Sequence, residues 1–183
     1  MADADTRRVA ALPAERAVHE AYRGPRPWGI ARDLVVPEAL DGDDRLWVPL
    51  GDAVWSRPLH LNVSAGHYVH LLRVRRCGLI QRHRHSGAVH GYVLRGRWHY
   101  LEHDWVAEDG AYVFEPPGET HTLIVPDDCS EMITLFMVQG ALTYVDPDGA
   151  ATGYDDVFTR IARYREHFEA VGLGADHVQR FVR

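Results

Sequence analysis

Short runs in which apolar and polar residues alternate occupy the middle of the chain, from about residue 46 to residue 146. Segments such as VWSRPLHLNV, HYVHLLRVRR and EMITLFMVQG are rich in β-branched and aromatic residues, and glycine, proline or aspartate separates them. Regularly spaced short strands of this kind are typical of a barrel or a sandwich. We therefore expect an all-β domain over residues 46–146.

The sequence on either side of this region has a different pattern. We expect a short helix at Pro13–Tyr22, followed by RGPRPWG, which interrupts regular structure. Toward the C-terminus, apolar residues in GYDDVFTRIARYREHFEAVGLG recur at helical spacing. The chain is thus predicted to consist of an N-terminal extension (1–45), a barrel (46–146) and a C-terminal helical segment (147–183) that packs on the barrel.

The predicted C-terminal helix carries one apolar stripe and recognisable ends. Asp155 or Asp156 can cap its first turn, and Gly172 can end it. The residues that share the stripe, and that we expect to contact the barrel, are Val157, Phe158, Ile161, Tyr164 and Phe168.

Composition and charge limit the classes of function. The chain has 183 residues, enough for one domain, and a formal net charge of −6 without a basic block, so nucleic acid is not an expected partner. All 20 basic residues are arginine, which excludes Schiff-base chemistry on a lysine. The sequence contains no apolar segment long enough to span a membrane and no apolar leader. We therefore expect a cytoplasmic protein in which Cys77 and Cys129 are free thiols.

Histidines are concentrated in the segment QRHRHSGAVHGYVLRG. On a strand, His83 and His85 project from the same face, because alternate side chains share a face. His121 follows a Pro-Pro-Gly turn in GAYVFEPPGETH, which can return the chain to a neighbouring strand and place a third imidazole opposite the pair. Three imidazoles on one side leave the other positions of a transition metal open, as a catalytic metal requires.

These two segments resemble the two motifs of the cupin superfamily. The first motif has two histidines separated by one residue, then a glutamate, then a glycine, and here it is HRHSGAVHGYVLRG, ending at Gly96. The second matches completely through Gly110, Pro116, Gly118 and His121. The resemblance covers about residues 46–146 and implies a cupin fold, a double-stranded β-helix or jelly-roll barrel.

The first motif lacks its usual glutamate. Counted forward from His85 the glutamate's place falls on His90, and counted back from Gly96 it falls on Val89. In this respect the chain is similar to cupins in which three histidines alone hold iron.

Further segments, among them VHGYVLRGRWHYLEHDWV and YVFEPPGETHTLIVPDD, resemble the 2,4'-dihydroxyacetophenone dioxygenases. That resemblance implies Fe(II) held by His83, His85 and His121. It also implies cleavage by O2 of the bond between an aryl ketone and its hydroxymethyl carbon, as in the catabolism of aromatic compounds.

Other residues are candidates for roles around the metal. Glu102 shares the parity of Trp98 and Tyr100, and can act as a fourth ligand or as a general base. His90 can support a ligand or be an ordinary strand residue. Trp98, Tyr100 and Tyr92 can line an aromatic pocket or fill the barrel core. Arg73 can bind a phenolate or a carboxylate of the substrate. The acidic residues beside the Pro-Pro-Gly turn, Glu115 and Glu119, are expected to face solvent.

Two alternatives to a dioxygenase remain open from the sequence. A metal cupin can act as a cyclase or isomerase in which the metal is only a Lewis acid. A cupin can also bind a small molecule without catalysis, because a fold does not fix a function. Histidine sites accept several ions, so Zn, Ni, Cu or Mn can replace Fe(II) in the isolated protein.

The first testable prediction concerns assembly. An exposed edge strand is a liability unless it is paired, and small barrels commonly associate through sheet faces or edges. We therefore expect a homodimer or homotetramer. Light scattering at micromolar concentration checks this, and a monomer under those conditions contradicts it.

Overall fold

The computed structural model describes residues 21–75 and 78–183. The chain divides into two units, Met1–Arg32 and Asp33–Arg183. In the first unit, residues 21–32 form no helix or strand and are exposed. The helix expected over Pro13–Tyr22 lies outside the described residues except for its last two positions, and Cys77 lies outside them as well.

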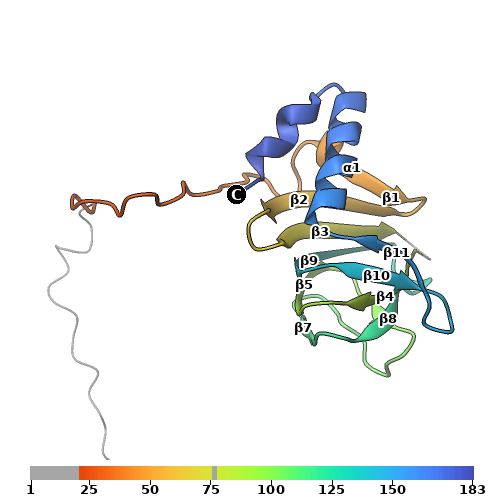
Figure 1. Ribbon diagram of the computed structural model, residues 1–183. Helices are drawn as coiled ribbons and strands as arrows, with labels where there is room; N and C mark the ends of the chain where they lie inside the picture. The colour runs from red at the N-terminus through yellow and green to blue at the C-terminus, as the bar shows by residue number, and fades with distance from the viewer. Residues whose placement is uncertain (1–20, 76–77) are drawn as a thin grey trace, which may run out of the picture. The chain divides into compact units, whose positions relative to one another are not determined.

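The second unit contains two antiparallel sheets that face each other (Figure 1), so the expectation of an all-β cupin-like barrel is confirmed. The six-stranded sheet has the order β1 (Val48–Gly51), β2 (Val54–Asn62), β3 (His67–Arg75), β9 (Glu131–Gln139), β5 (Val89–Arg95) and β7 (Tyr112–Glu115). The five-stranded sheet has the order β11 (Ala151–Asp155), β10 (Leu142–Val145), β4 (Leu79–His85), β8 (Thr120–Ile124) and β6 (His99–Tyr100). A short 3-10 helix, η2 (Asp44–Leu46), precedes β1.

The hydrophobic core lies between the two sheets, where alternate residues of each strand point inward. Its largest member is Trp98, which is fully buried and whose indole Nε1–H donates a hydrogen bond to Thr134 Oγ1 at 3.0 Å. Trp98 therefore fills the core, one of the two roles considered for it. Cys129 is also buried, as a free thiol.

Glycines at the two sequence motifs have backbone roles. Gly118, in the Pro-Pro-Gly turn, has a φ of 89°, and its N–H donates to the carbonyl of His85 at 2.8 Å. The N–H of His85 in turn donates to the carbonyl of Glu119 at 3.2 Å. At Gly96, with a φ of 77°, a Cβ atom would lie 2.2 Å from the carbonyl oxygen of Glu131. The turn therefore ties the start of β8 to the end of β4.

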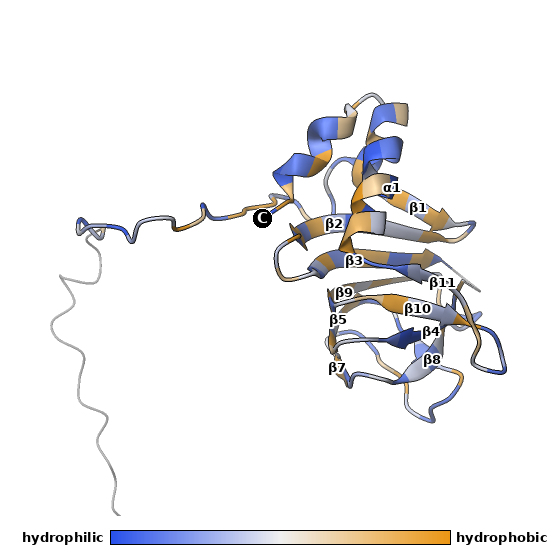
Figure 2. Ribbon diagram, in the orientation of Figure 1, coloured by the Kyte–Doolittle hydropathy of each residue, from blue (hydrophilic) through white to orange (hydrophobic). Residues whose placement is uncertain are grey.

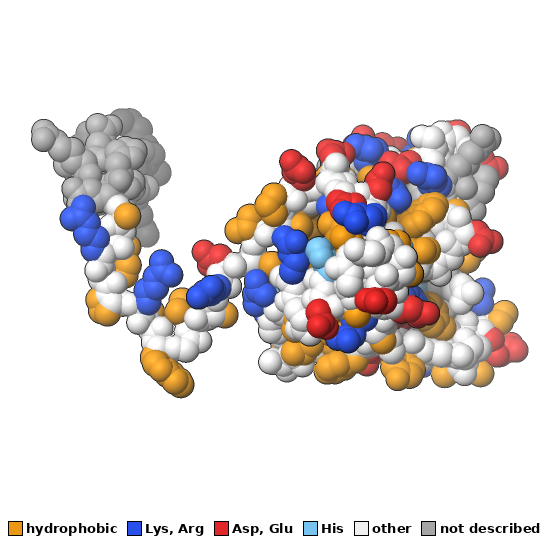
Figure 3. Space-filling view, turned by 90° about the horizontal axis from the view of Figure 1, so that it is seen from above, with side chains coloured by type: hydrophobic (Ala, Val, Ile, Leu, Met, Phe, Trp, Pro, Cys, Tyr) orange, Lys and Arg blue, Asp and Glu red, His pale blue; other side chains and the backbone are white. Residues whose placement is uncertain are grey.

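The C-terminal segment adds one strand and two helices. Strand β11 extends the five-stranded sheet beyond residue 146, and α1 (Val157–Ala170) and η3 (Ala175–Arg180) follow it. Helix α1 begins with a capping box between Asp156 and Thr159, and Gly172 beyond its end has a φ of 76°, as the sequence predicts. Acidic and basic side chains are interspersed on the face of the molecule that Figure 3 shows from above.

Among the described residues, no helix is long and apolar enough to cross a membrane.

The buried face of α1 differs from the predicted stripe at one position. Val157, Tyr164 and Phe168 are buried as expected, but Phe158 is 59% exposed and Arg160 is buried in its place. A helical stripe that is defined by apolar residues alone excludes a charged side chain such as that of Arg160. Arg160 can be buried because its Nε lies 2.7 Å from Oδ2 of Asp155, the last residue of β11.

A buried polar chain joins α1 to the six-stranded sheet. Ser56 on β2 is hydrogen-bonded to His70 Nδ1 at 2.8 Å and to the Tyr164 hydroxyl at 2.6 Å. Burial holds the pKa of His70 well below 6.5, and the nearby positive charge of Arg160 lowers it further. His70 is therefore neutral in the folded protein at neutral pH.

The state of His70 predicts how stability depends on pH. In the unfolded chain histidine has a pKa of about 6.5, so below that pH the histidine is protonated in the unfolded state while His70 in the folded state stays neutral. The free energy of unfolding should therefore fall as the pH drops below 6.5, by up to about 1.4 kcal/mol per pH unit for this one group. His70→Gln removes this contribution, so its stability should fall less steeply than that of the parent. Urea unfolding of chelator-treated protein between about pH 7.5 and pH 5.5 tests this, and equal slopes contradict it.

Candidate metal centre

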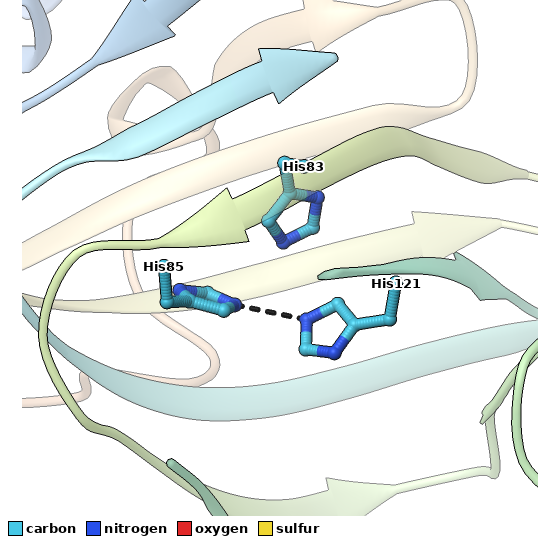
Figure 4. A group of neighbouring side chains, drawn as sticks. All are labelled: His83, His85 and His121. Carbon is cyan, nitrogen blue, oxygen red and sulfur yellow. Dashed lines mark hydrogen bonds between the residues drawn. The ribbon is translucent and has the colours of Figure 1, made fainter. Parts of the chain in front are cut away.

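Strands β4 and β8 bring three histidines together on the inner face of the five-stranded sheet. His83 and His85 lie on β4, His121 lies on β8, and the register pairs His83 with His121. All three are buried, and one ring nitrogen of each lies within 4.8 Å of the other two (Figure 4). Strand β4 is among the most hydrophilic elements in Figure 2, yet its two histidines point into the barrel.

The hydrogen bonds of these rings direct nitrogens toward one point. His83 Nδ1 lies 2.7 Å from the carbonyl oxygen of Gln81, which can only accept, so Nδ1 carries the proton and Nε2 keeps its lone pair. The Nε2 atoms of His85 and His121 lie 2.9 Å apart. The arrangement thus presents Nε2 atoms from two strands to a common position.

Burial keeps the imidazoles of His83 and His121 in the neutral form that binds metal. Burial lowers the pKa of His83 to about 4, with a further contribution from neighbouring His85. Burial, followed by the charges of His83 and His85, lowers the pKa of His121 to about 2. Both rings are therefore neutral at pH 7, as metal ligation requires.

Glu115 is a member of this group that the sequence analysis missed. Its side chain is 3% exposed rather than solvent-facing, and its Oε2 lies 2.9 Å from His85 Nε2 and 3.5 Å from His121 Nε2. The last residue of β7, Glu115 follows the strand's alternation, in which Val113 points inward and Phe114 outward. That shared parity with Val113 was the signal in the sequence that could have identified it.

The two positions at which the motif glutamate can fall have different surroundings. Val89 is buried and lines the cavity, whereas His90 has the opposite parity. Val89 pairs with Glu115 across β5 and β7. A carboxylate therefore reaches the three histidines from the neighbouring strand instead.

Tyr100 connects the carboxylate to the histidines. Its hydroxyl donates to Glu115 Oε1 at 2.5 Å, and its ring stacks on that of His121 with centroids 3.6 Å apart. Burial, followed by the charge of Glu115, raises the pKa of Tyr100 well above its usual value, so it remains a donor. This contact holds one carboxylate oxygen and leaves Oε2 facing the histidines.

A cavity of about 450 Å³ lies between the sheets beside this group. His83, His85, Tyr100 and Glu115 line one part of it. Much of the remaining wall is apolar, and its buried members are Val54, Leu72, Val89, Leu123, Phe136, Val138 and Leu142. A volume of this size suits a small organic molecule.

The residues present fit a divalent transition metal. Two ligands about 2.1 Å from a metal and about 90° apart are about 3.0 Å from each other. The 2.9 Å between the Nε2 atoms of His85 and His121 matches that separation. Imidazole nitrogens with one carboxylate suit Fe, Zn, Cu, Ni or Mn, so the donor set does not choose among them.

The structure does not bring Glu102 to the histidines. Strand β6 ends at Tyr100, and a turn at residues 101–102 breaks the alternation on which the expected inward orientation depended. The exposed Glu102 carboxylate instead accepts hydrogen bonds from the N–H and hydroxyl of Thr122, at 2.7 and 3.0 Å. Thr122 follows His121 on β8, so Glu102 ties the turn to this strand from outside the cavity.

Two further candidates lie on the outer face of the six-stranded sheet. His90 is hydrogen-bonded through Nδ1 to the Tyr112 hydroxyl at 2.7 Å, and its ring lies near that of Phe114. Tyr92 is 47% exposed on the same strand. Neither lines the cavity, because residues with the parity of Val89 take the inner face of β5.

Arg73 is also placed outside the cavity. Its guanidinium carbon lies 4.3 Å from the ring centre of Trp47 and 4.9 Å from that of Trp55. Arginine between two indoles contributes cation–π attraction and covers apolar surface. Of the four residues predicted to bind substrate, Tyr100 is therefore the one that lines the cavity, since Trp98 fills the core beside it.

His121 belongs to a second group as well. The second group consists of His103, Glu119 and His121, and each contributes one possible ligand atom within 4.8 Å of the other two. His103 Nε2 lies 2.6 Å from Glu119 Oε1. Glu119 is partly buried rather than free in solvent. His121 is therefore shared by two sets of side chains that could hold a metal ion.

Two antiparallel sheets that enclose a group of three histidines define a cupin barrel, and residues 36–143 match the model of the ChrR cupin-like domain. The chain belongs to this family. No curated protein sequence matches the chain.

Solved structures share the fold. An RmlC-like cupin protein from Ralstonia eutropha JMP134 is 27% identical, with a TM-score of 0.69 over 76% of this chain and 90% of that one. An acetylacetone dioxygenase from Acinetobacter johnsonii is 15% identical, with a TM-score of 0.65 over 81% of this chain and 99% of that one. At that identity the second likeness concerns the fold alone.

The geometry predicts which histidines hold metal. Replacing His83, His85 or His121 with alanine should in each case remove most of the bound metal and leave a folded barrel, because a catalytic metal site is rarely the main source of stability in a domain of this size. His90→Ala is the matched control, because His90 is a histidine of the adjacent motif that faces outward, and it should keep full occupancy. Elemental analysis of protein purified without chelator, together with circular dichroism, provides the measurement. Unchanged metal occupancy in two of the three variants would contradict the assignment of these histidines as metal ligands.

Proposed function

We propose that this protein is an Fe(II)-dependent dioxygenase that cleaves the carbon–carbon bond beside the carbonyl of an enolisable ketone. An aryl α-hydroxyketone similar to 2,4'-dihydroxyacetophenone is the proposed substrate type. The observation that carries the proposal is the group of buried imidazoles with the Glu115 carboxylate beside them, at the wall of a largely apolar cavity.

The ligand set favours an anionic, chelating substrate. Ligating imidazoles carry no charge, and Glu115 beside them loses its charge when it takes a proton, so a divalent ion would keep a net positive charge that favours an enolate over a neutral ketone. When bound, ferrous iron would supply open positions for two substrate oxygens and the redox chemistry of dioxygen.

Glu115 is the proposed base that forms the enolate. Its Oε2 faces the histidine nitrogens, where the carbonyl end of a substrate would lie, and it can take the proton from the carbon next to the carbonyl. The Tyr100 hydroxyl holds Oε1 and so orients the carboxylate. The carboxylate and the phenol thus act as a base and its positioning group.

The cavity wall supplies the remaining requirements. Side chains such as Leu72, Val138 and Phe136 exclude bulk water and give an aryl group apolar contacts. In the proposed reaction one oxygen atom of O2 enters each product. An aryl hydroxymethyl ketone and O2 therefore give an arenecarboxylic acid and formic acid, with no further reductant.

Two likenesses support the proposal. The sequence resembles the 2,4'-dihydroxyacetophenone dioxygenases in both histidine motifs. One structure of the same fold is named an acetylacetone dioxygenase, and acetylacetone is itself an enolisable ketone, so this fold can carry such chemistry.

The activity predicts oxygen uptake that depends on both metal and ketone. Protein loaded with Fe(II) should consume one O2 per molecule of aryl hydroxymethyl ketone cleaved, and the chelated protein should consume none. An oxygen electrode with chromatography of the acids measures both quantities. Ketone conversion without oxygen uptake would favour a cyclase or isomerase instead.

The placement of the two glutamates predicts opposite effects on turnover. Glu115→Gln keeps the size and the contact with Tyr100 but loses the base, so turnover should fall by roughly 10²- to 10⁴-fold. Bound iron should fall much less. Glu102→Gln is the matched control and should stay within about twofold of the parent, because its carboxylate lies outside the cavity. Oxygen consumption per bound iron is the readout, and parental turnover in Glu115→Gln refutes the role.

A further inference from the structure

Arg160 is a buried charge in the wall of the same cavity, apart from the metal centre. It lies in the first turn of α1, is 3% exposed, and lines the cavity. Its Nε faces Asp155 Oδ2 at 2.7 Å, yet Nη1 has no hydrogen-bond partner among residues 21–75 and 78–183. Buried guanidinium N–H groups normally have acceptors, so this one points to an acceptor that enters the cavity.

Tyr68 offers a second unsatisfied donor at the same place. It is completely buried on β3, lines the cavity, and its hydroxyl has no hydrogen-bond partner in the described part of the chain. The guanidinium carbon of Arg160 lies 5.2 Å from the centre of the Tyr68 ring. Burial raises the pKa of Tyr68 above its usual value, so this phenol is a donor at neutral pH. Two donors without acceptors therefore lie side by side.

Arg160 shares its carboxylate partner with a second arginine. Asp155 lies 2.7 Å from Arg160 and 3.9 Å from Arg163, and its other oxygen accepts the hydroxyl of Thr159. Both arginines line the cavity, whereas Asp155 does not. One carboxylate therefore serves two guanidinium groups, of which Arg163 is 44% exposed, and neighbouring His70 is neutral. Asp52 and Glu115 also line the cavity, so the excess of positive charge is local to Arg160, where a buried guanidinium favours an anion.

This polar wall is close to the ligand histidines. Tyr144 lines the cavity, pairs with His83 across β10 and β4, and has its ring centre 6.3 Å from that of His83. The charge of Arg160 also acts on both Tyr144 and His83. A single small molecule can thus contact the metal centre at one end and Arg160 at the other.

We propose that Arg160, with the hydroxyls of Tyr68 and Tyr144, binds an anionic oxygen group of the substrate, most favourably a carboxylate. Guanidinium binds carboxylate through paired N–H groups, and the phenols add donors from the side. The substrate class is then an aryl ketone with an acidic group at the end remote from the ketone. The orientation of the ketone toward His83, His85 and His121 rests on the proposed function.

Variants can separate this role from a purely structural one. Arg160→Met leaves Asp155 without its closest cation and can destabilise α1. Tyr68→Phe avoids that difficulty, because it removes a hydroxyl that has no partner in the described chain and should leave the unfolding midpoint unchanged or higher. Tyr112→Phe is the control: its hydroxyl is hydrogen-bonded to His90 on the outer face of the six-stranded sheet and does not line the cavity. It should keep the ligand preference of the parent.

The test measures binding without oxygen. Zinc-loaded protein is titrated in a calorimeter with para-acetylbenzoate, with its neutral methyl ester, and with para-hydroxyacetophenone above the pKa of that phenol. The parent should bind the carboxylate at least about tenfold more tightly than the ester, as expected for charge-assisted hydrogen bonds. The ratio of the two affinities should fall to near one in Arg160→Met, fall by at least about threefold in Tyr68→Phe, and stay unchanged in Tyr112→Phe.

Each outcome has a definite meaning. Stronger binding of the phenolate than the carboxylate, with the same dependence on Arg160, supports the anion site and assigns it to a phenolate. Equal affinity of the parent for acid and ester overturns the proposal, as does a preference that survives in both Arg160→Met and Tyr68→Phe. A carboxylate preference without oxygen uptake on any ketone would keep this site and refute the dioxygenase instead.

Discussion

The antiparallel pairing of β4 with β8 is the constraint on which the site depends. It sets His83 opposite His121 and, through alternation along β4, places His85 on the same inner face. The Pro-Pro-Gly turn fixes this pairing, because the backbone at Gly118 and Glu119 is bonded to that of His85. A shift of β4 by one residue would turn His83 and His85 away from His121 and toward solvent. The register therefore determines whether the protein has a metal centre at all.

Burial between the sheets gives the imidazoles their chemical state. The low pKa values of His83 and His121 have the same first cause, loss of solvent, and the proximity of other histidines adds to it. The same enclosure places Glu115 close to the ring nitrogens of His85 and His121. Glu115 lies on β7, which pairs with β5 at Val89. The carboxylate that the motif lacks at its usual place is thus supplied one strand away, on the same inner wall.

Helix α1 takes part in the cavity as well as in the fold. Its apolar residues Tyr164 and Phe168 pack in the core, and Arg160 on the same face reaches the cavity wall. The barrel strands provide the histidines and the apolar lining, while the added helix provides buried positive charge. The cavity wall is therefore built from two parts of the chain, the barrel strands and the first turn of α1.

The sequence by itself determined the strand-rich middle of the chain, the C-terminal helix with its caps, and the three histidines that come together. The strands and the helix follow from local rules: alternation with a period of two, helical spacing, and glycines where the backbone needs a positive φ. The grouping of the three histidines follows from the Pro-Pro-Gly turn and the resemblance to the two cupin motifs. The tertiary structure decided the places of Glu115, Glu102 and Arg160. The alternation of inward and outward side chains along a strand does not continue through the turn at 101–102. Alternation within one strand also does not determine which strands become neighbours. Whether a charged side chain is buried depends on partners that only the folded chain supplies, as Asp155 does for Arg160.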